Sequence, residues 1–211
     1  MINIAIDGPA GAGKSSLSKL LAKELSYIYV DTGALYRAVG LKFSRMGFDT
    51  ELKGDIDTIL EDTMLDIRFV DGTQRVFLDG EDVSDDIRTP TASMMASAVS
   101  AKPVVREFLL GMQRKLAQKN NVVMDGRDIG TVILPGADVK IFLTADVKVR
   151  AERRYKELLE KGQEVSFDEV LEDAARTGSR YRDICRCRDD LLGFLDVNGW
   201  FGQEPVNCGR D

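Results

Sequence analysis

The sequence predicts an α/β fold in which helices cover both faces of a parallel sheet and a small antiparallel β element is inserted. Three observations predict it. A glycine-rich loop joins an apolar run to an amphipathic stretch within residues 2–25, helical patterns alternate with short apolar runs further along, and residues 64–80 alternate apolar with polar positions. Buried apolar strands that alternate with helices are typical of a parallel sheet covered on both faces.

Composition narrows the class of protein. With 211 residues, 44% of them hydrophobic and 30% charged, the chain is expected to form a soluble globular fold of about one to one and a half ordinary domains. A net charge of -6 argues against nucleic acid or an anionic membrane as a partner. No apolar run approaches the length of a membrane span and no signal-peptide pattern is present, so the cytoplasm is the expected location.

The sequence contains no histidine. Catalysis by Ser-His or Cys-His pairs, histidine general bases and H-E-x-x-H zinc sites are therefore excluded. Phosphoryl transfer between two phosphates is compatible with this composition, because it needs positioning and charge neutralisation more than proton removal.

The loop between the first predicted strand and the helix over 14–25 matches G-x-x-x-x-G-K-[ST]. Its glycines allow successive N–H groups to curl around an anion, and the positive end of the helix points to the same place. We expect a nucleoside triphosphate here, with the Lys14 ammonium on its outer phosphates and the Ser15 hydroxyl on Mg²⁺. The alternative is a glycine-rich turn with a chance lysine. The residues expected to bind the nucleotide are Gly8, Pro9, Ala10, Gly11, Ala12, Gly13, Lys14, Ser15 and Ser16.

The next predicted elements are a short strand at 28–30, a helix over 34–46 and a shorter helix within 55–63. Residues 64–80 then alternate around Asp71-Gly72, a hairpin turn signal. We expect a small antiparallel sheet inserted between helices. Such a module can carry acceptor specificity or be a structural excursion only.

Two helices and two buried strands follow: a short helix broken near Pro103, a long helix to Lys119, and strands at 122–124 and 139–143. Ligands of parallel sheets bind at the carboxyl ends of the strands. Three aspartates fall at such ends, namely Asp7, Asp31 and Asp125.

Charged residues near the later strands are further candidates. Asp125 can hold Mg²⁺ directly or through water, or can cap a turn. Arg127 and Asp128 share its loop, where an arginine can bind phosphate and a carboxylate can accept from a sugar or base; a structural ion pair is the alternative. Arg37 and Arg106 are candidates for an acceptor phosphate; for each, an ordinary surface residue is the alternative.

Arg150, Arg153 and Arg154 lie within about one and a half turns of a predicted helix. Spacings of three and four residues place at least two of them on one face. A mobile helix that closes over a triphosphate would use such cations to neutralise developing charge and to exclude water. A solvated helix face is the alternative.

Six segments together resemble bacterial cytidylate kinase over about residues 1–173: DGPAGAGKSS, VDTGALYRA, GEDVSDDIRTP, SAKPVVREFLLGMQRKLA, VMDGRDIGTVILPGADVKIFLTA and RAERRYKELLEKG. The resemblance implies a P-loop nucleoside monophosphate kinase fold, ATP and Mg²⁺ on the donor side, and CMP or dCMP as acceptor. It also implies that the hairpin belongs to the acceptor-binding module. We expect a monomer with small-molecule substrates.

With the resemblance, the candidate residues take roles. The expected catalytic residues are Lys14, Arg127, Arg150 and Arg154. The residues expected to bind cytidylate are Thr32, Arg37, Ser97, Arg106, Arg127 and Asp128. The expected metal ligands are Ser15 and Asp125. The single domain, 1–211, is expected to divide into a core (about 1–35 and 103–145, with the C-terminal end left open), an acceptor-binding insertion (about 36–102, with its hairpin at 64–80) and a lid (about 146–165).

The tail over 174–211 departs from the family pattern, in which a helix after the lid carries R-x-x-x-D-x-x-R and then Pro-Leu. If Arg176 takes the first position, Arg180 stands at the aspartate and Asp183 at the second arginine. Every lysine lies at or before Lys161, whereas all three cysteines lie in the tail. We hypothesise a shifted reading frame or divergence in this tail. A Cys-x-Cys metal or redox element is the alternative, with too few ligands for zinc.

Other functions stay open beside phosphorylation of CMP and dCMP. Another monophosphate or small-metabolite kinase would share the phosphate-binding loop. A non-catalytic ATP-binding protein would fit the altered tail. A GTPase switch needs an [NT]-K-x-D element, which this sequence lacks.

Overall fold

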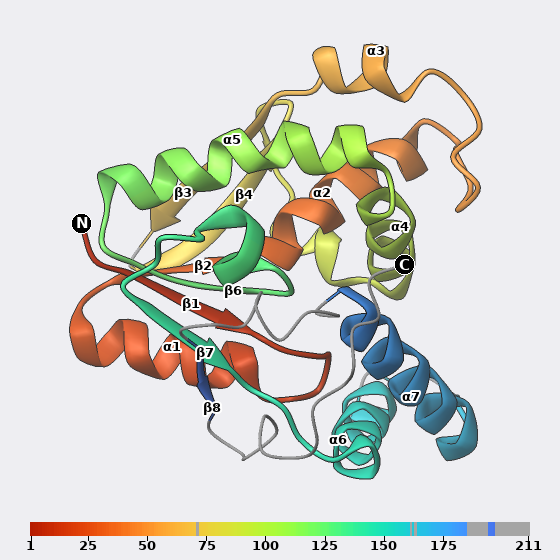
Figure 1. The fold of residues 1–211 in the computed structure, drawn as a ribbon. Coiled ribbons are helices and arrows are strands. Elements are labelled where there is room, and N and C mark those ends of the chain that lie inside the picture. The colour runs from red at the N-terminus through yellow and green to blue at the C-terminus, as the bar shows by residue number, and fades with distance from the viewer. Residues whose placement is uncertain (71, 161, 163, 185–193, 197–211) are drawn as a thin grey trace, which may run out of the picture. The chain divides into compact units, whose positions relative to one another are not determined.

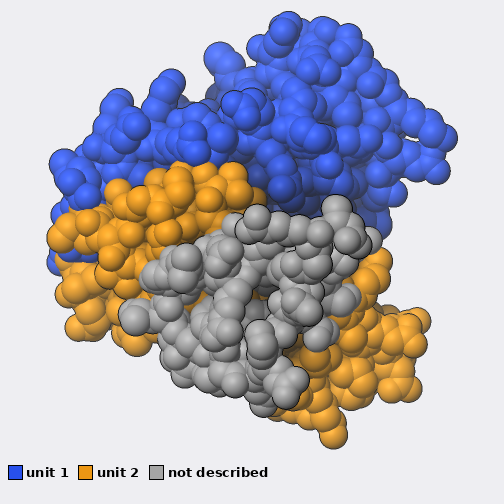
Figure 2. All heavy atoms as spheres, in the orientation of Figure 1, with its two compact units in different colours: residues 1, 26–122 blue, residues 2–25, 123–211 orange. Residues whose placement is uncertain are grey.

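The structure is a computed structural model that describes residues 1–70, 72–160, 162, 164–184 and 194–196. The chain forms two compact units, shown in different colours in Figure 2. Unit 1 contains Met1 and residues 26–122, and unit 2 contains residues 2–25 and 123–211. The cysteines, Cys185, Cys187 and Cys208, lie outside the described residues, so the metal or redox hypothesis for them stays untested.

Unit 2 is built on parallel strands that lie side by side in the order β6, β1, β7 and β8 (Figure 1). β1 pairs in parallel with β7, with Ile4 opposite Val139 and Asp7 opposite Phe142, and β7 pairs in parallel with β8. The apolar runs of β1 and β6 are almost completely buried, as a sheet covered on both faces requires. The bounds are Asn3–Asp7 for β1, Val122–Gly126 for β6, Val139–Phe142 for β7 and Phe194–Asp196 for β8.

The helices of unit 2 pack in two groups: one on the sheet, the other as a pair of helices against each other. α1 packs on β1, as does η2, a single turn of π-helix. α6 and α7 pack against each other through a small apolar cluster of Ala151, Val170 and Ala174. Among the described residues, no helix is long and apolar enough to cross a membrane. The bounds are Lys14–Leu25 for α1, Ile129–Ile133 for η2, Val147–Glu160 for α6 and Phe167–Ile184 for α7.

Unit 1 combines helices with a small antiparallel sheet of order β3-β4-β5. The hairpin between β3 and β4 was predicted from the alternating pattern, and its register places Val70 opposite Thr73. Asp71 of the predicted turn lies outside the described residues. The bounds are Ile28–Asp31 for β2, Thr32–Arg45 for α2, Ile56–Glu61 for α3, Leu65–Val70 for β3, Thr73–Leu78 for β4, Glu81–Asp82 for β5, Asp86–Arg88 for η1, Pro90–Ser100 for α4 and Pro103–Lys119 for α5.

Helix α2 is the centre of unit 1 because it buries two faces. One face carries Leu35, Val39 and Phe43 into a cluster with apolar residues of α3, α4 and α5. The other face carries Ala34 and Ala38 against the β4–β5 region. Burial of each large apolar side chain stabilises the unit by roughly 1.5–3 kcal/mol. Helix α2 is therefore firmly packed between the other helices and the small sheet.

At Gly40, α2 and α4 approach each other almost backbone to backbone. A Cβ atom at position 40 would lie 2.9 Å from the backbone nitrogen of Ala96 and 2.9 Å from the Cβ of Met95. Real Cβ atoms essentially never come so close. The absence of a side chain at this position is thus what permits the close crossing of the two helices.

The predicted elements up to β7 are confirmed, most of them to within one or two residues at each end. The helix around residue 174 was not predicted: α7 runs through that position to Ile184. The reading-frame hypothesis for the tail is not tested by this helix. Most of the tail, 185–193 and 197–211, lies outside the described residues.

Candidate active site

The glycine-rich loop after β1 depends on backbone conformations that favour glycine. Gly8, Gly11 and Gly13 have φ angles of 148°, 75° and 97°. At Gly8 a Cβ atom would lie 1.9 Å from the carbonyl oxygen of Leu143, so no side chain fits there. The loop then enters α1, whose N-terminal N–H groups provide the positive end that binds phosphate. The loop therefore has the expected conformation, and binding of an anion by its residues stays a prediction.

Two side chains of this loop take positions suited to nucleotide and metal. The Lys14 ammonium donates a hydrogen bond of 2.9 Å to the carbonyl oxygen of Pro9, which folds it back over the loop. The Ser15 hydroxyl donates a hydrogen bond of 2.8 Å to the carboxylate of Asp125, which is 4% exposed at the carboxyl end of β6. Ser16 is exposed in the first turn of α1.

The donor atoms at Ser15 and Asp125 fit Mg²⁺. A hydroxyl and a carboxylate are hard oxygen ligands, and Mg²⁺ commonly binds one or two protein groups together with substrate phosphates and water. Within the part of the chain that the structure describes, no group of three His, Cys, Asp or Glu side chains forms a closed metal cage. This donor set therefore suits a metal ion that is shared with a phosphate ligand.

Asp7, the last residue of β1, connects the strand to the loop that carries Arg127 and Asp128. Its carboxylate accepts hydrogen bonds of 2.8 Å from the backbone N–H groups of both Ile129 and Gly130. Burial raises the pKa of Asp7 to about 6, against the two backbone hydrogen bonds, which lower it. These hydrogen bonds tie the end of β1 to the first two residues of η2.

The arginines of α6 occupy three different environments. Arg150 is only 3% exposed, and its guanidinium donates to the carbonyl oxygens of Ala145, Ala10 and Ala174 at 3.1–3.3 Å. It thereby links α6 to the phosphate-binding loop and to α7.

The next two arginines are more exposed. Arg153 donates to the carbonyl oxygens of Gly11 and Ala12 in the phosphate-binding loop, at 3.2 and 3.4 Å. Arg154, which is 42% exposed, pairs instead with Glu157 one turn along α6 at 2.9 Å. A catalytic role for Arg150 and Arg154 stays a prediction.

In unit 1, the start of α2 brings together two of the expected cytidylate-binding residues. Asp31 is the N-cap: one carboxylate oxygen accepts from the Ala34 N–H at 3.0 Å, and the other accepts from Arg37 at 2.9 Å. Thr32, the first residue of α2, is buried. The N-cap aspartate thus holds Arg37 in a defined orientation at the helix N-terminus.

The other two candidates of unit 1 lie near the junction of α4 and α5, and each contacts Ser100. Ser97 is exposed on α4, and Arg106 is exposed in the first turn of α5. The Arg106 side chain donates to the carbonyl oxygen of Ser100 at 2.7 Å, while the Ser100 hydroxyl donates to the carbonyl oxygen of Ser97 at 2.9 Å. Arg106 therefore stabilises the C-terminus of α4.

Three residues in or near these sites were not among the predicted site residues. Asp7 was recognised only as a strand-end aspartate, and Arg153 only as one of three arginines. The contact of Gln74 with Asp31, described below, had no signal in the sequence. The sequence signal that points to Asp7 is a carboxylate at the end of a strand, directly before a glycine-rich loop.

The parallel sheet with flanking helices, the phosphate-binding loop and the oxygen ligands beside it define a nucleotide-binding phosphotransferase of the P-loop class. Comparison with known proteins identifies its family. The family model for cytidylate kinase matches residues 4–188. This chain belongs to the cytidylate kinase family.

Several curated relatives support the assignment. A cytidylate kinase of Caldicellulosiruptor bescii is 55% identical over 172 residues, which cover 82% of this chain and 76% of the relative. One from Caldanaerobacter subterraneus subsp. tengcongensis is 54% identical, covering 84% and 78%. One from Carboxydothermus hydrogenoformans is 50% identical over 210 residues, covering 97% and 94%. The family match therefore continues past residue 174 to residue 188, and one of these relatives aligns with nearly the whole chain.

Proposed function

We propose that this protein transfers the γ-phosphate of ATP to CMP and to dCMP, with ADP and CDP or dCDP as products. In the proposed step, an oxygen of the acceptor phosphate forms a bond to the γ-phosphorus of ATP. The bond from that phosphorus to the bridging oxygen of ADP breaks on the opposite side. The observation that carries the proposal is the phosphate-binding loop with Lys14 and the Ser15–Asp125 pair, in a chain of the cytidylate kinase family.

On the donor side, the loop amides and Lys14 would bind the β- and γ-phosphates. Ser15 and Asp125 would hold Mg²⁺, which when bound neutralises charge on those phosphates. Lys14 now contacts the Pro9 carbonyl, so its ammonium would exchange this contact for a phosphate oxygen. Binding and orientation by these residues is the larger part of catalysis, because phosphoryl transfer asks little covalent chemistry of the protein.

On the acceptor side, we propose that the cytidylate-binding residues are Thr32, Arg37, Ser97, Arg106, Arg127 and Asp128. Arg37 is suited to phosphate because its planar guanidinium can keep Asp31 on one N–H group and offer others to the ligand. Asp128 can accept from the cytosine amine or the sugar. No general base is required, since the attacking phosphate is already an anion.

The arginines expected to act in catalysis are Arg127, Arg150 and Arg154. Arg127 is exposed and Arg154 is partly exposed, so both would contact the ligand from the surface, whereas Arg150 would act from its buried contact with the phosphate-binding loop. Their proposed role is to neutralise charge on the transferring phosphoryl group. The monomeric state and the cytoplasmic location expected from the sequence remain predictions.

A coupled assay of ADP release tests the function. With ATP and Mg²⁺ present, CMP, dCMP, UMP, AMP and GMP are compared at the same concentrations, and we expect kcat/KM for CMP and dCMP to exceed that for the purine nucleotides by about 100-fold or more. Preference for another acceptor would identify a different monophosphate kinase. Binding of ATP without turnover of any nucleotide would indicate a non-catalytic ATP-binding protein.

A further inference from the structure

The side chain of Gln74, on β4, pairs with both backbone polar groups of Asp31. The Asp31 N–H donates to the Gln74 side-chain oxygen at 2.8 Å, and the Gln74 side-chain nitrogen donates to the Asp31 carbonyl oxygen at 3.2 Å. A side-chain amide thus contacts the end of β2 as a neighbouring strand would. Both contacts lie within unit 1.

Asp31 is the residue that connects this contact to the acceptor side. Its carboxylate caps α2 through the Ala34 N–H and holds Arg37 through a 2.9 Å ion pair. A shift in the Asp31 backbone would therefore move both the first turn of α2 and the Arg37 guanidinium. A binding group that is already held in place loses less conformational entropy when the ligand binds, so binding is tighter.

We propose that Gln74 is a positioning residue for the acceptor: it fixes the backbone of Asp31, so that Asp31 presents Arg37 to the acceptor phosphate. This inference rests on the proposed function, because it takes Arg37 as a phosphate-binding residue. Gln74 itself does not contact the phosphate. The small antiparallel sheet then orients the acceptor-binding end of α2 as well as packing against that helix.

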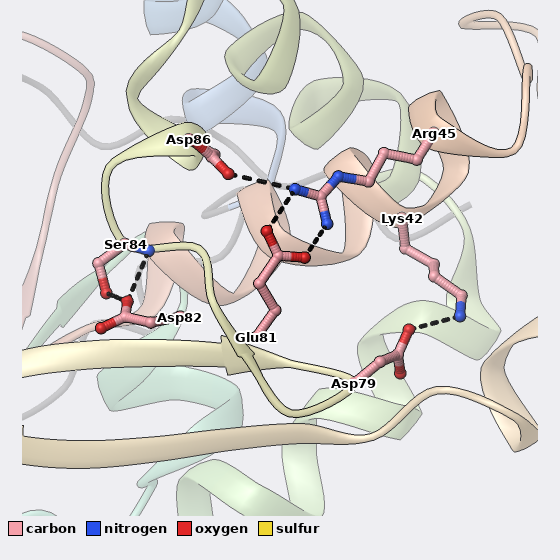
Figure 3. Close-up of polar contacts among 7 residues, drawn as sticks. All are labelled: Lys42, Arg45, Asp79, Glu81, Asp82, Ser84 and Asp86. Atoms are coloured by element: carbon pink, nitrogen blue, oxygen red, sulfur yellow. Dashed lines mark hydrogen bonds and ion pairs between the residues drawn. The ribbon is translucent and has the colours of Figure 1, made fainter.

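The opposite end of α2 is held by a different set of contacts, to the β4–β5 turn, β5 and η1 (Figure 3). Lys42 pairs with Asp79 at 2.6 Å, and Arg45 pairs with Glu81 at 2.7 Å and with Asp86 at 3.1 Å. These ion pairs lie one to two turns beyond Arg37 and do not include a candidate acceptor residue. They provide a matched control within the same helix and sheet.

The test compares Gln74→Met, which has similar length but cannot make either hydrogen bond, with Lys42→Met. In Gln74→Met we expect KM for CMP to rise about tenfold, because small misplacements of a binding group cost up to 100-fold. KM for ATP should stay within about twofold, since the donor loop is untouched. In Lys42→Met both KM values should stay within about twofold, because a partly exposed ion pair contributes little.

Hydrogen exchange gives a second readout that does not depend on turnover. Gln74→Met should speed amide exchange in residues 31–37 and leave residues 42–46 unchanged. Lys42→Met should instead leave residues 31–37 unchanged, and any faster exchange should be confined to residues 42–46. Unchanged KM for CMP in Gln74→Met, or an equal rise in both KM values, would overturn the inference while the proposed function stands. If the wild-type chain binds ATP but does not turn over CMP, the proposed function fails, and the positioning role for an acceptor fails with it.

Discussion

The hydroxyl of Ser15 and the carboxylate of Asp125 are joined by a 2.8 Å hydrogen bond across 110 residues of sequence. One residue belongs to the phosphate-binding loop and the other to the end of β6. Neighbouring strands of a parallel sheet end at the same edge, so ligand-binding groups distant in sequence meet there. This pair is the proposed Mg²⁺ site.

Asp125→Asn should therefore weaken the binding of Mg²⁺. We expect the Mg²⁺ concentration for half-maximal activity to rise by about 10–100-fold, because the amide keeps the size of the carboxylate but loses its charge. Titration of Mg²⁺ at saturating ATP and CMP measures it. Asp138→Asn is the control, because Asp138 directly precedes β7, at the amino end of that strand, whereas Asp125 lies at the carboxyl end of β6. Equal Mg²⁺ curves for the two variants would contradict the site.

Lys14→Met should lower kcat by about 100-fold or more, because it removes a preorganised cation from the transferring phosphate. Lys23→Met removes an exposed lysine from the last turn of the same helix and should leave kcat unchanged. Steady-state kinetics with ATP and CMP measures both. A Lys14→Met enzyme as fast as the wild type would remove the basis for the donor site.

Substitutions of Arg150 and Arg154 should differ in their effect on the stability of the protein. Arg150→Met leaves three backbone carbonyl groups without their arginine partner, so the free energy of unfolding should fall by about 3 kcal/mol. Arg154→Met breaks an exposed ion pair and should change it by less than about 1 kcal/mol.

Urea unfolding and kcat are measured on both arginine variants. If Arg154 acts on the phosphates, its variant loses about 100-fold in kcat while remaining stable. A stable Arg154→Met with unchanged kcat would show that this arginine has no catalytic role. A fully stable Arg150→Met would contradict the structural contacts assigned to Arg150.

Asp7 should make stability depend on pH. Its pKa is raised from 3.8 to about 6 in the folded protein, mainly by burial. The folded state therefore holds the proton more tightly than the unfolded state. This contribution to stability is fully present below about pH 4 and is lost as pH rises through about 6. The loss corresponds to about 3 kcal/mol at most.

Urea unfolding of the wild type and Asp7→Asn between pH 4 and 7 measures this contribution, because the neutral asparagine cannot titrate. The free energy of unfolding of the wild type, relative to the variant, should decrease across that range. The variant also loses one of two backbone hydrogen bonds, which shifts its stability by a constant amount and does not affect the slope. Parallel pH profiles would show that Asp7 titrates normally.

Local patterns predicted much of the fold. Gly13 marks the entry to α1, and the predicted helix over residues 14–25 has the bounds of the observed one. Period-two alternation predicted the β3–β4 hairpin. The π-helical turn at Ile129–Ile133 was not predicted, because its hydrogen bonds with Asp7 depend on a strand 122 residues away.

The site was predictable only where its residues are adjacent in sequence or fall at strand ends. The phosphate-binding loop meets the first condition, and Asp125 meets the second. Helical spacing could not show that Arg150 is buried while Arg154 faces outward, because it does not say which face packs. The pairing of Gln74 with Asp31 joins two elements whose register the sequence leaves undetermined.

The crossing at Gly40 limits how unit 1 can respond to a ligand. Because α2 and α4 pack so closely that no side chain fits at position 40, there is little free space for one helix to shift against the other there. We therefore expect the separation between Arg37 on α2 and Ser97 on α4 to change little when a ligand binds. If both residues bind the acceptor as proposed, this nearly constant separation would favour a small nucleotide over a larger one.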